Sequence, residues 1–408
     1  MTNEIPSTEA TSEAATGDAA ASTTTSQAVQ RKIPFTKPTL TGREAGYLNE
    51  VLESGKLTGG GRFLKACEAW LQAQTGCVRV LLTTSCTHAL EISALLSGVG
   101  PGDEVIMPSF TFVSTANAFA LRGAIPVFVD NRPDTLNIDE TKIEAAITPR
   151  TKAIVPVHYA GISCDMDAIM AIADKHKLMV VEDSAQGLCS SHRGKALGTI
   201  GATGTFSFHE TKNVVAGEGG ALMINDPELV ERAQNIREKG TNRRQFLLGQ
   251  VDKYTWVDVG SAYLPSELMA AFLLGQLEGA ETLTAQRLRL WQRYNDTLAS
   301  LEASERLRRP IVPEGCVHNA HIYYVLLPTR KARDSVLTTL AEAGIGASFH
   351  FVPLESAPAG LKYARHHGTL STTEDTAGRL LRLPLFADLP DADQDYVIER
   401  LTAAVEAH

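Results

Sequence analysis

The 408-residue sequence has no long apolar run, no excess of positive charge and no paired cysteines. No apolar stretch approaches the ~18 residues that a membrane span needs, so a membrane partner is not expected. Because 38 Lys and Arg face 47 Asp and Glu, the net charge is −9. That balance argues against a nucleic-acid partner, since phosphate backbones are bound by basic surfaces.

The six cysteines are scattered and include no CxxC pair. This usage is typical of reduced thiols, and we expect a cytoplasmic protein without a disulfide framework. No Cys/His set has the spacing of a zinc site, so no metal is expected.

Residues 1–30 consist mainly of Ser, Thr, Ala, Glu and Gly. Such a segment cannot bury enough apolar surface to offset the entropy of ordering it, which predicts a disordered tail. It has neither the basic start nor the apolar stretch of a signal peptide, and its acidic residues argue against a mitochondrial presequence.

A large α/β domain is predicted over residues 31–277. Seven short apolar runs lie between residues 79 and 224, at 80–82, 105–107, 127–129, 154–157, 179–181, 205–208 and 221–224. Stretches with helical spacing of apolar residues lie between most of these runs. One example contains Met166, Ile169, Met170 and Ala173 at the period of a helix, and Asp165 is placed to cap it. Apolar strands that alternate with helices indicate a mostly parallel, seven-stranded sheet covered on both faces.

Residues 278–408 predict a smaller α+β domain. A long helical stretch covers 278–301, strand-like runs cover 322–327 and 347–351, and a helix follows Pro390, with Val397, Leu401 and Val405 on one face.

Lys212 is the first candidate catalytic residue. It follows the apolar run at 205–208 in the segment SFHETKN, just before the glycine-rich stretch 217–220. A lysine in a desolvated site loses proton affinity and becomes a nucleophilic amine that can form a Schiff base. The alternative is a solvated surface lysine.

Polar residues follow three other predicted strands. Asp183 ends the strand near 179–181, at the edge where ligands of open α/β sheets bind, and could hold a ring nitrogen protonated; alternatively it caps a helix. The segment TSCTH (84–88) precedes a helix and could bind an anion or simply provide an N-cap. Phe112, in PSFTF, could stack on a flat ring or pack in the core. Together with Lys212, these groups are what a pyridoxal phosphate site requires.

The order TSCTHAL, PSFTF, EDSAQ, SFHETKN, GEGGAL resembles the DegT/DnrJ/StrS nucleotide-sugar aminotransferases, from Ile33 to near the C-terminus. The resemblance implies the aminotransferase fold of type I, with pyridoxal 5′-phosphate bound to Lys212. It further implies that Asp183 pairs with the pyridine nitrogen. The other cofactor-binding residues it implies are Phe112 on the ring, Gln186 near the ring hydroxyl, and Cys86, Thr87 and Ser207 on the phosphate.

The same resemblance bears on substrates and assembly. Segments 237–246, 250–256, 260–268, 319–327 and 349–354 look most like transaminases that make dTDP-4-amino-4,6-dideoxy-D-galactose from dTDP-4-oxo-6-deoxy-D-glucose and L-glutamate, for surface polysaccharide of the enterobacterial common antigen type. His350 stands where relatives have sugar-proximal residues, although a structural histidine is an equal alternative. A homodimer is implied. Many relatives place a partner-subunit Asn or Arg on the phosphate where this chain has Leu264.

Four alternatives remain open from the sequence. The enzyme could aminate at C3 or act on a UDP sugar. A sugar dehydratase is disfavoured because those relatives have histidine at the position of Lys212. A non-catalytic sensory relative is disfavoured because Lys212 and Asp183 are both present.

Overall fold

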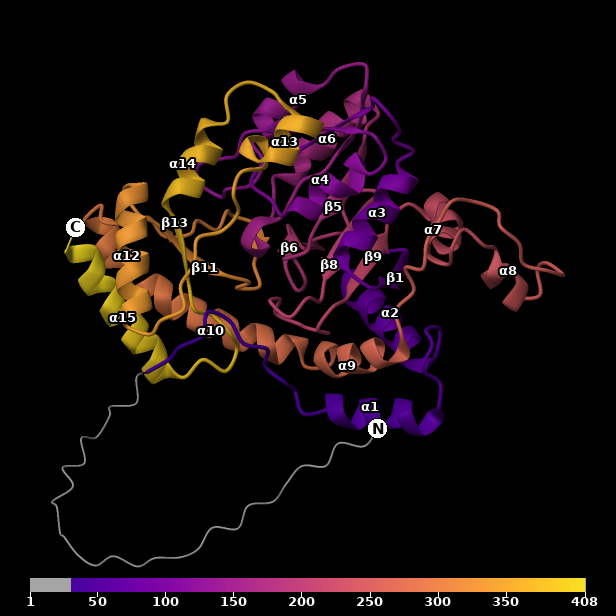
Figure 1. The fold of residues 1–408 in the computed structure, drawn as a ribbon, viewed down its shortest axis with the longest axis horizontal. Coiled ribbons are helices and arrows are strands. Elements are labelled where there is room, and N and C mark those ends of the chain that lie inside the picture. The colour runs from indigo at the N-terminus through magenta and orange to yellow at the C-terminus, as the bar shows by residue number, and fades with distance from the viewer. Residues whose placement is uncertain (1–30, 408) are drawn as a thin grey trace, which may run out of the picture. The chain divides into compact units, whose positions relative to one another are not determined.

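The apolar runs between residues 79 and 224 form seven strands of a mixed, mostly parallel sheet (Figure 1). The computed structural model describes residues 31–407, so the predicted tail at 1–30 lies outside the described residues. The strand order is β1-β9-β8-β5-β4-β2-β3-β12, and only β9 runs against its neighbours. The strands are β1 (Arg79–Thr83), β2 (Glu104–Pro108), β3 (Ile125–Val129), β4 (Thr151–Ile154), β5 (Met179–Asp183), β8 (Thr203–Ser207), β9 (Gly220–Ile224) and β12 (Arg365–His366).

Helices cover both faces of this sheet, as predicted. The faces alternate along β2: Val105 and Met107 pack with α3 and α4, whereas Ile106 packs with α5 and α6. Asp165 caps α6, its Oδ1 accepting the Ala168 N–H at 3.1 Å. The helices before residue 278 are α1 (Glu44–Ser54), α2 (Arg62–Thr75), α3 (Cys86–Leu96), α4 (Val113–Ala120), α5 (Ile143–Ala146), α6 (Met166–His176), α7 (Val230–Arg237), α8 (Arg243–Leu247) and α9 (Glu267–Leu277).

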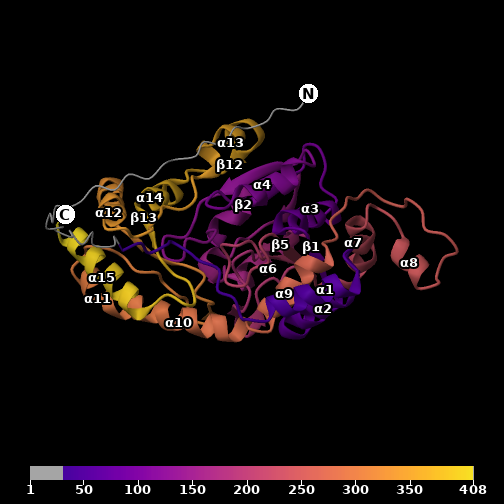
Figure 2. The ribbon, with the colours of Figure 1, turned by 60° about the horizontal axis from the view of Figure 1, so that its bottom comes forward.

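The C-terminal part contributes a second hydrophobic core around a two-stranded antiparallel sheet, β11 (Tyr323–Leu326) and β13 (Leu380–Leu383). Its helices are α10 (Ala280–Thr297), α11 (Ala299–Ala303), α12 (Arg330–Glu342), α13 (Pro358–Tyr363), α14 (Ser371–Arg379) and α15 (Asp391–Glu406). The predicted helix after Pro390 is confirmed as α15, and Val397, Leu401 and Val405 are buried. Figure 2 shows α10 leading from α9 toward α11 and α15.

Three predictions here need correction. The sheet has eight strands and not the seven predicted, because β12, whose two residues form no apolar run, pairs with β3 at the edge. The helical stretch at 278–301 is interrupted at Leu298, which separates α10 from α11. The strand predicted at 347–351 is wrong: only Ser348 forms a bridge, to Arg382. The reason is that the Arg382 side chain occupies the Phe349 carbonyl, donating from Nε at 3.2 Å and from Nη2 at 2.9 Å, so that carbonyl does not pair with a strand N–H.

Several short elements complete the described part of the chain. A three-stranded sheet is formed by β10 (Cys316–Val317), β6 (Ser191–His192) and β7 (Lys195–Ala196), and one-turn 3₁₀ helices lie at Glu140–Lys142, Tyr159–Gly161, Pro227–Leu229 and Leu354–Ser356. Residues 32–408 cluster as one unit, and the division at residue 277 into two domains stays a prediction. Among the described helices, none is both long and apolar enough to cross a bilayer.

The eighth strand, β12, is held to the sheet by a buried carboxylate. Glu104, on β2, accepts from Arg365 Nε at 3.0 Å and Nη2 at 2.7 Å, from Thr148 Oγ1 at 2.8 Å, and from Arg150. The Arg365 guanidinium is the main cause that lowers the pKa of Glu104 to about 2. Because a lowered folded-state pKa stabilises only the ionised protein, this contribution is present above about pH 4.5 and is lost as the pH falls toward 2.

We therefore expect Glu104→Gln to lower the free energy of unfolding by about 3 kcal/mol at pH 7, since it leaves guanidinium groups without their buried partner. The measurement is urea denaturation at a series of pH values, and the deficit should shrink below pH 4.5. Glu144, whose ion pair with Lys175 is exposed to solvent, provides a matched control. Glu144→Gln should leave the midpoint of urea denaturation unchanged. A constant deficit down to pH 3 would contradict the electrostatic explanation.

Candidate active site

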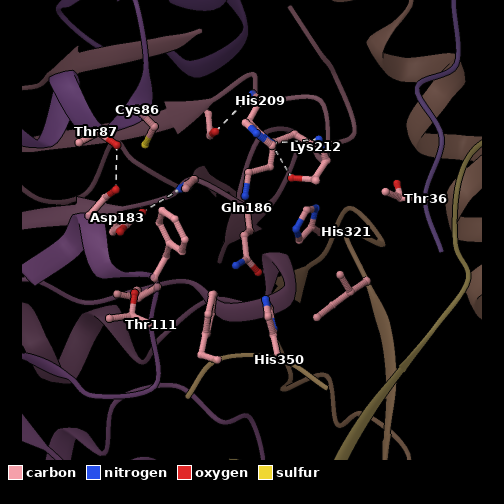
Figure 3. A pocket seen from close by; sticks show the side chains of 18 of the residues that line it. Thr36, Cys86, Thr87, Thr111, Asp183, Gln186, His209, Lys212, His321 and His350 are labelled. Carbon is pink, nitrogen blue, oxygen red and sulfur yellow. Dashed lines mark hydrogen bonds between the residues drawn. The ribbon is translucent and has the colours of Figure 1, made fainter. Parts of the chain in front are cut away.

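A cavity of about 670 Å³ opens where the chain leaves the carboxyl ends of β1, β2, β5 and β8. This size is typical of pockets that hold a small molecule. The structure brings all eight sequence-predicted site residues to its walls: Cys86, Thr87, Phe112, Asp183, Gln186, Ser207, Lys212 and His350. Figure 3 shows Thr87, Cys86 and Asp183 on one side of the pocket and His321 and Thr36 on the other.

Lys212 lies in the loop of an antiparallel hairpin formed by β8 and β9. The loop is closed by backbone bonds on both sides: Phe208 N–H to the Gly219 carbonyl at 2.9 Å and Glu210 N–H to the Gly217 carbonyl at 3.0 Å. A further bond, from Lys212 N–H to the His209 carbonyl at 2.9 Å, makes a turn at the lysine itself. Lys212 is therefore held in the loop at the carboxyl end of β8, where it lines the cavity. The alternative of a solvated surface lysine is not what the structure shows.

The cavity changes the ionisation of the groups that line it. Desolvation is the main cause that lowers the pKa of Lys212, opposed by the charge of Asp183 and assisted by that of Arg382. Burial raises the pKa of the Cys86 thiol to about 12, which disfavours the thiolate that a nucleophilic cysteine needs. The amine of Lys212 is the group whose shift favours nucleophilic chemistry.

The N-terminus of α3 forms one wall. The Ser85 Oγ caps this helix by accepting the His88 N–H at 3.2 Å, which confirms the capping alternative for the TSCTH segment without excluding anion binding. Gly220 of β9 allows the helix to approach closely, because a Cβ there would lie 2.3 Å from the Cys86 nitrogen. The first turn of α3 therefore lies beside the β8–β9 hairpin that carries Lys212. The Thr87 hydroxyl in this turn is 2.8 Å from Ser114 Oγ.

Asp183 is 4 % exposed and ends β5 inside the cavity. Its Oδ2 accepts from Thr115 Oγ1 at 2.6 Å, and Thr115 in turn is 2.8 Å from Thr111 Oγ1. Its Oδ1 accepts the Ala185 N–H at 3.2 Å. No α-helix starts here, so the helix-capping alternative is wrong, and the carboxylate is oriented toward the pocket.

Two further predicted residues, Phe112 and Gln186, line the cavity. Phe112 is 59 % exposed and its ring is 6.4 Å from that of Phe351, so it does not pack in the core. Gln186 accepts the Ala160 N–H through Oε1 at 2.7 Å. Its Nε2 group makes no hydrogen bond to the described part of the chain. The ring face and the amide are thus available to a ligand.

His350 approaches from the segment between α12 and α13. Its Nδ1 is 2.7 Å from the Tyr159 hydroxyl. Burial raises the pKa of Tyr159 well above its usual value and lowers the pKa of His350 well below its own. We assign Tyr159 as donor to Nδ1, which leaves Nε2–H of a neutral imidazole as the other polar group of the ring.

Sequence reasoning missed a set of residues that connects the lysine loop to the C-terminal part. His321 Nδ1 is 3.1 Å from Asn213 Oδ1, and Asn213 Nδ2 donates to the Asn319 carbonyl at 2.8 Å. Asn319 Nδ2 donates in turn to the carbonyl of Gln186 at 2.8 Å. No local pattern in residues 319–322 predicts this role. Only the likeness of segment 319–327 to relatives distinguishes these residues in the sequence.

Two other expectations concern residues outside the pocket. Leu264 packs within its own chain against a core cluster that includes Phe63, and its Cγ would lie 2.9 Å from a Cβ on Gly59.

Asp165, Asp167 and His192 bring potential metal ligands within 4.8 Å of one another. Asp165 already caps α6 and Asp167 pairs with Arg193 at 2.7 Å, so this group is engaged in other contacts.

The pocket fits pyridoxal phosphate. The free amide groups at the start of α3, with Thr87 and Ser207, suit the phosphate. The exposed ring of Phe112 suits the pyridine face, the oriented carboxylate of Asp183 suits a ring N–H, and the desolvated Lys212 suits the aldehyde.

Comparisons with known proteins agree with this fit. The model of the DegT/DnrJ/EryC1/StrS aminotransferase family matches residues 38–402. The aminotransferase TlmJ of Streptoalloteichus hindustanus is 34% identical, with a TM-score of 0.85 over 92% of this chain and 100% of its own.

Two other solved structures are similar. The putative sugar aminotransferase Spr1654 of Streptococcus pneumoniae, in its PMP form, is 28% identical, with a TM-score of 0.83 over 92% of this chain and 100% of its own. PseC of Helicobacter pylori, an aminotransferase of pseudoaminic acid biosynthesis, is 26% identical, with a TM-score of 0.84 over 93% and 100%. This chain belongs to the DegT/DnrJ/EryC1/StrS aminotransferase family, has its type I fold, and uses pyridoxal phosphate.

We expect Asp183→Asn to retain the cofactor but to lose amino transfer by orders of magnitude, because the charge that holds the ring nitrogen protonated is removed while the shape is kept. Single-turnover absorbance with L-glutamate measures this loss. Borohydride reduction followed by peptide mapping should place the pyridoxyl group on Lys212 in the wild type and in Asp183→Asn, and nowhere in Lys212→Ala. Near-normal turnover of Asp183→Asn would show that the ring nitrogen lies elsewhere.

Proposed function

We propose that this sugar aminotransferase moves the amino group of L-glutamate to C4 of dTDP-4-oxo-6-deoxy-D-glucose, forming dTDP-4-amino-4,6-dideoxy-D-galactose for surface polysaccharide of the enterobacterial common antigen type. The observation that carries the reaction type is the desolvated Lys212 in one cavity with the carboxylate of Asp183. The sugar is supported by the likeness of five segments to transaminases of that substrate: 237–246, 250–256, 260–268, 319–327 and 349–354.

The side chains divide the work of the two half-reactions. Pyridoxal phosphate, when bound, supplies an electron sink for the bonds at the amino-acid Cα. Asp183, oriented by Thr115, holds a proton at the ring nitrogen by charge pairing. Lys212 moves the proton at Cα, and its lowered pKa suits that task because a larger share of the amine is then neutral and able to accept a proton.

On the sugar side, His350 offers a donor. Since Tyr159 occupies Nδ1, the Nε2–H is the group left to bind an oxygen of the ketosugar. Residues 349–354 also carry Phe351, whose ring is 3.7 Å from the His350 ring and narrows the cavity on that side.

A panel of ketosugars tests the substrate assignment. The aminated enzyme, prepared with L-glutamate, should convert dTDP-4-oxo-6-deoxy-D-glucose to the 4-amino-4,6-dideoxygalactose product in a single turnover, as identified by NMR. The UDP-linked and 3-oxo analogues should react more slowly. Faster reaction of a UDP sugar or a 3-oxo sugar would replace the proposed substrate, and inertness toward every ketosugar would reject the proposed function.

We also propose that the enzyme is a homodimer that uses the segment 243–259. Figure 2 shows α8 and the loop after it extending away from the sheet. This segment exposes large apolar side chains: Phe246, Leu247, Leu248, Tyr254, Trp256, Val257 and Val259. Trp256 is 76 % exposed. Clustered exposed apolar groups mark protein interfaces, and a symmetric second copy is the commonest partner.

Trp256→Ser should therefore shift the enzyme from dimer to monomer at micromolar concentration, because it removes the largest exposed apolar surface of this segment. Sedimentation velocity measures the shift. Leu361→Ser is the matched control, since Leu361 is 74 % exposed on α13 and should not affect assembly. A wild-type monomer with full activity would overturn the proposal.

A further inference from the structure

Two arginines of the C-terminal part line the cavity and are not used by the chemistry above. Arg287 belongs to α10 and Arg382 to β13. Arg287 is 4 % exposed and Arg382 is half-buried. Neither has a carboxylate within 4 Å among residues 31–407, although most of the other buried or half-buried arginines there are paired.

Backbone carbonyl groups hold both guanidinium groups in place. Arg287 donates from Nε to the Ala320 carbonyl at 3.1 Å and from Nη2 to the His321 carbonyl at 2.5 Å. Arg382 donates from Nε and Nη2 to the Phe349 carbonyl, and its Cζ lies 4.6 Å from the centre of the Phe35 ring. In both residues Nη1 makes no hydrogen bond within the described chain, so its N–H donors remain for a ligand.

The cavity around them is rich in positive charge. Burial lowers the pKa of Arg287 to about 9 and also lowers that of Arg382. After desolvation, the charges of Lys212 and of these arginines contribute to the lowered pKa of His321. The carboxylate of Asp183 is already bound by Thr115, and Glu218, the other acidic group at the walls, is largely exposed. A buried cation without a partner is costly, which favours an anionic ligand at this place.

The position separates this ligand from the cofactor phosphate. Arg287 bonds the backbone of His321, and Figure 3 shows His321 across the pocket from Thr87 and Cys86 at the start of α3. Two guanidinium groups from different elements suit two carboxylates, because each free Nη1 can donate a charge-assisted hydrogen bond to a carboxylate oxygen. The diphosphate of a nucleotide sugar offers related chemistry and is the competing source of negative charge.

We propose that Arg287 and Arg382 form a carboxylate subsite that binds the amino donor and selects a dicarboxylic amino acid. This inference rests on the proposed aminotransferase reaction and adds the residues that recognise its donor. Alanine and other donors with one carboxylate would engage only one guanidinium group, and would therefore bind more weakly than glutamate.

The test is calorimetric binding of glutarate, an unreactive dicarboxylate, to the holoenzyme. Arg382→Gln should raise the Kd for glutarate about 10- to 100-fold, the usual range for losing a charged hydrogen-bonded contact. Arg382→Lys and Arg287→Lys keep the positive charge but lose the guanidinium group, and should raise the Kd for glutarate less. Arg379→Gln is the matched control: Arg379 bonds the Leu327 carbonyl and Asp375, lies outside the cavity, and should leave the Kd unchanged.

A second arm identifies the source of the anion. Binding of dTDP to the same variants should change little, and the KM for glutamate should rise in parallel with the Kd for glutarate. Unchanged glutarate binding in Arg382→Gln and Arg287→Lys, or a loss confined to dTDP, would overturn the carboxylate subsite. If the wild type binds glutarate in an Arg382-dependent way yet aminates no ketosugar, the proposed sugar substrate fails while the subsite stands.

Discussion

The site depends on how the end of β5 is fixed, and one buried carboxylate fixes it. Glu182 is fully buried and accepts four hydrogen bonds: from the N–H groups of Gly198 at 2.8 Å, Ile200 at 2.6 Å and Gly201 at 2.7 Å, and from His158 Nε2 at 2.9 Å. Because successive side chains of a strand point to opposite faces, anchoring Glu182 away from the pocket turns Asp183 into it. The orientation of the Asp183 carboxylate in the cavity is thus set by its neighbour Glu182.

The cofactor side of the site could be predicted because its residues are tied to strand ends. Buried parallel strands are visible as apolar runs, and their carboxyl ends share one edge of the sheet. Lys212, Asp183 and Thr87 each follow such a run within a few residues, so placing the strands was enough to bring these groups together. Local signals such as the Asp165 cap were equally readable, since capping depends on a few consecutive residues.

The other side of the pocket could not be predicted in this way. His321 reaches the lysine loop through Asn213, a contact across 108 positions of sequence, and neither residue has a periodicity that indicates it. The segment 347–351 looked like a strand because its apolar residues alternate, but the Arg382 side chain competes for a backbone carbonyl there. Such outcomes depend on tertiary packing, which overrides local propensity.

Gly220 has a consequence for how this enzyme can vary. Helix α3 and the hairpin that carries Lys212 touch at this residue, where even the methyl group of alanine would meet the backbone of Ser85 and Cys86. Any larger residue would have to push the two walls apart and so increase the distance between the first turn of α3 and Lys212. An engineer who exchanges α3 with a relative must therefore exchange the β8–β9 hairpin as well, because the two pack without space for a side chain at Gly220.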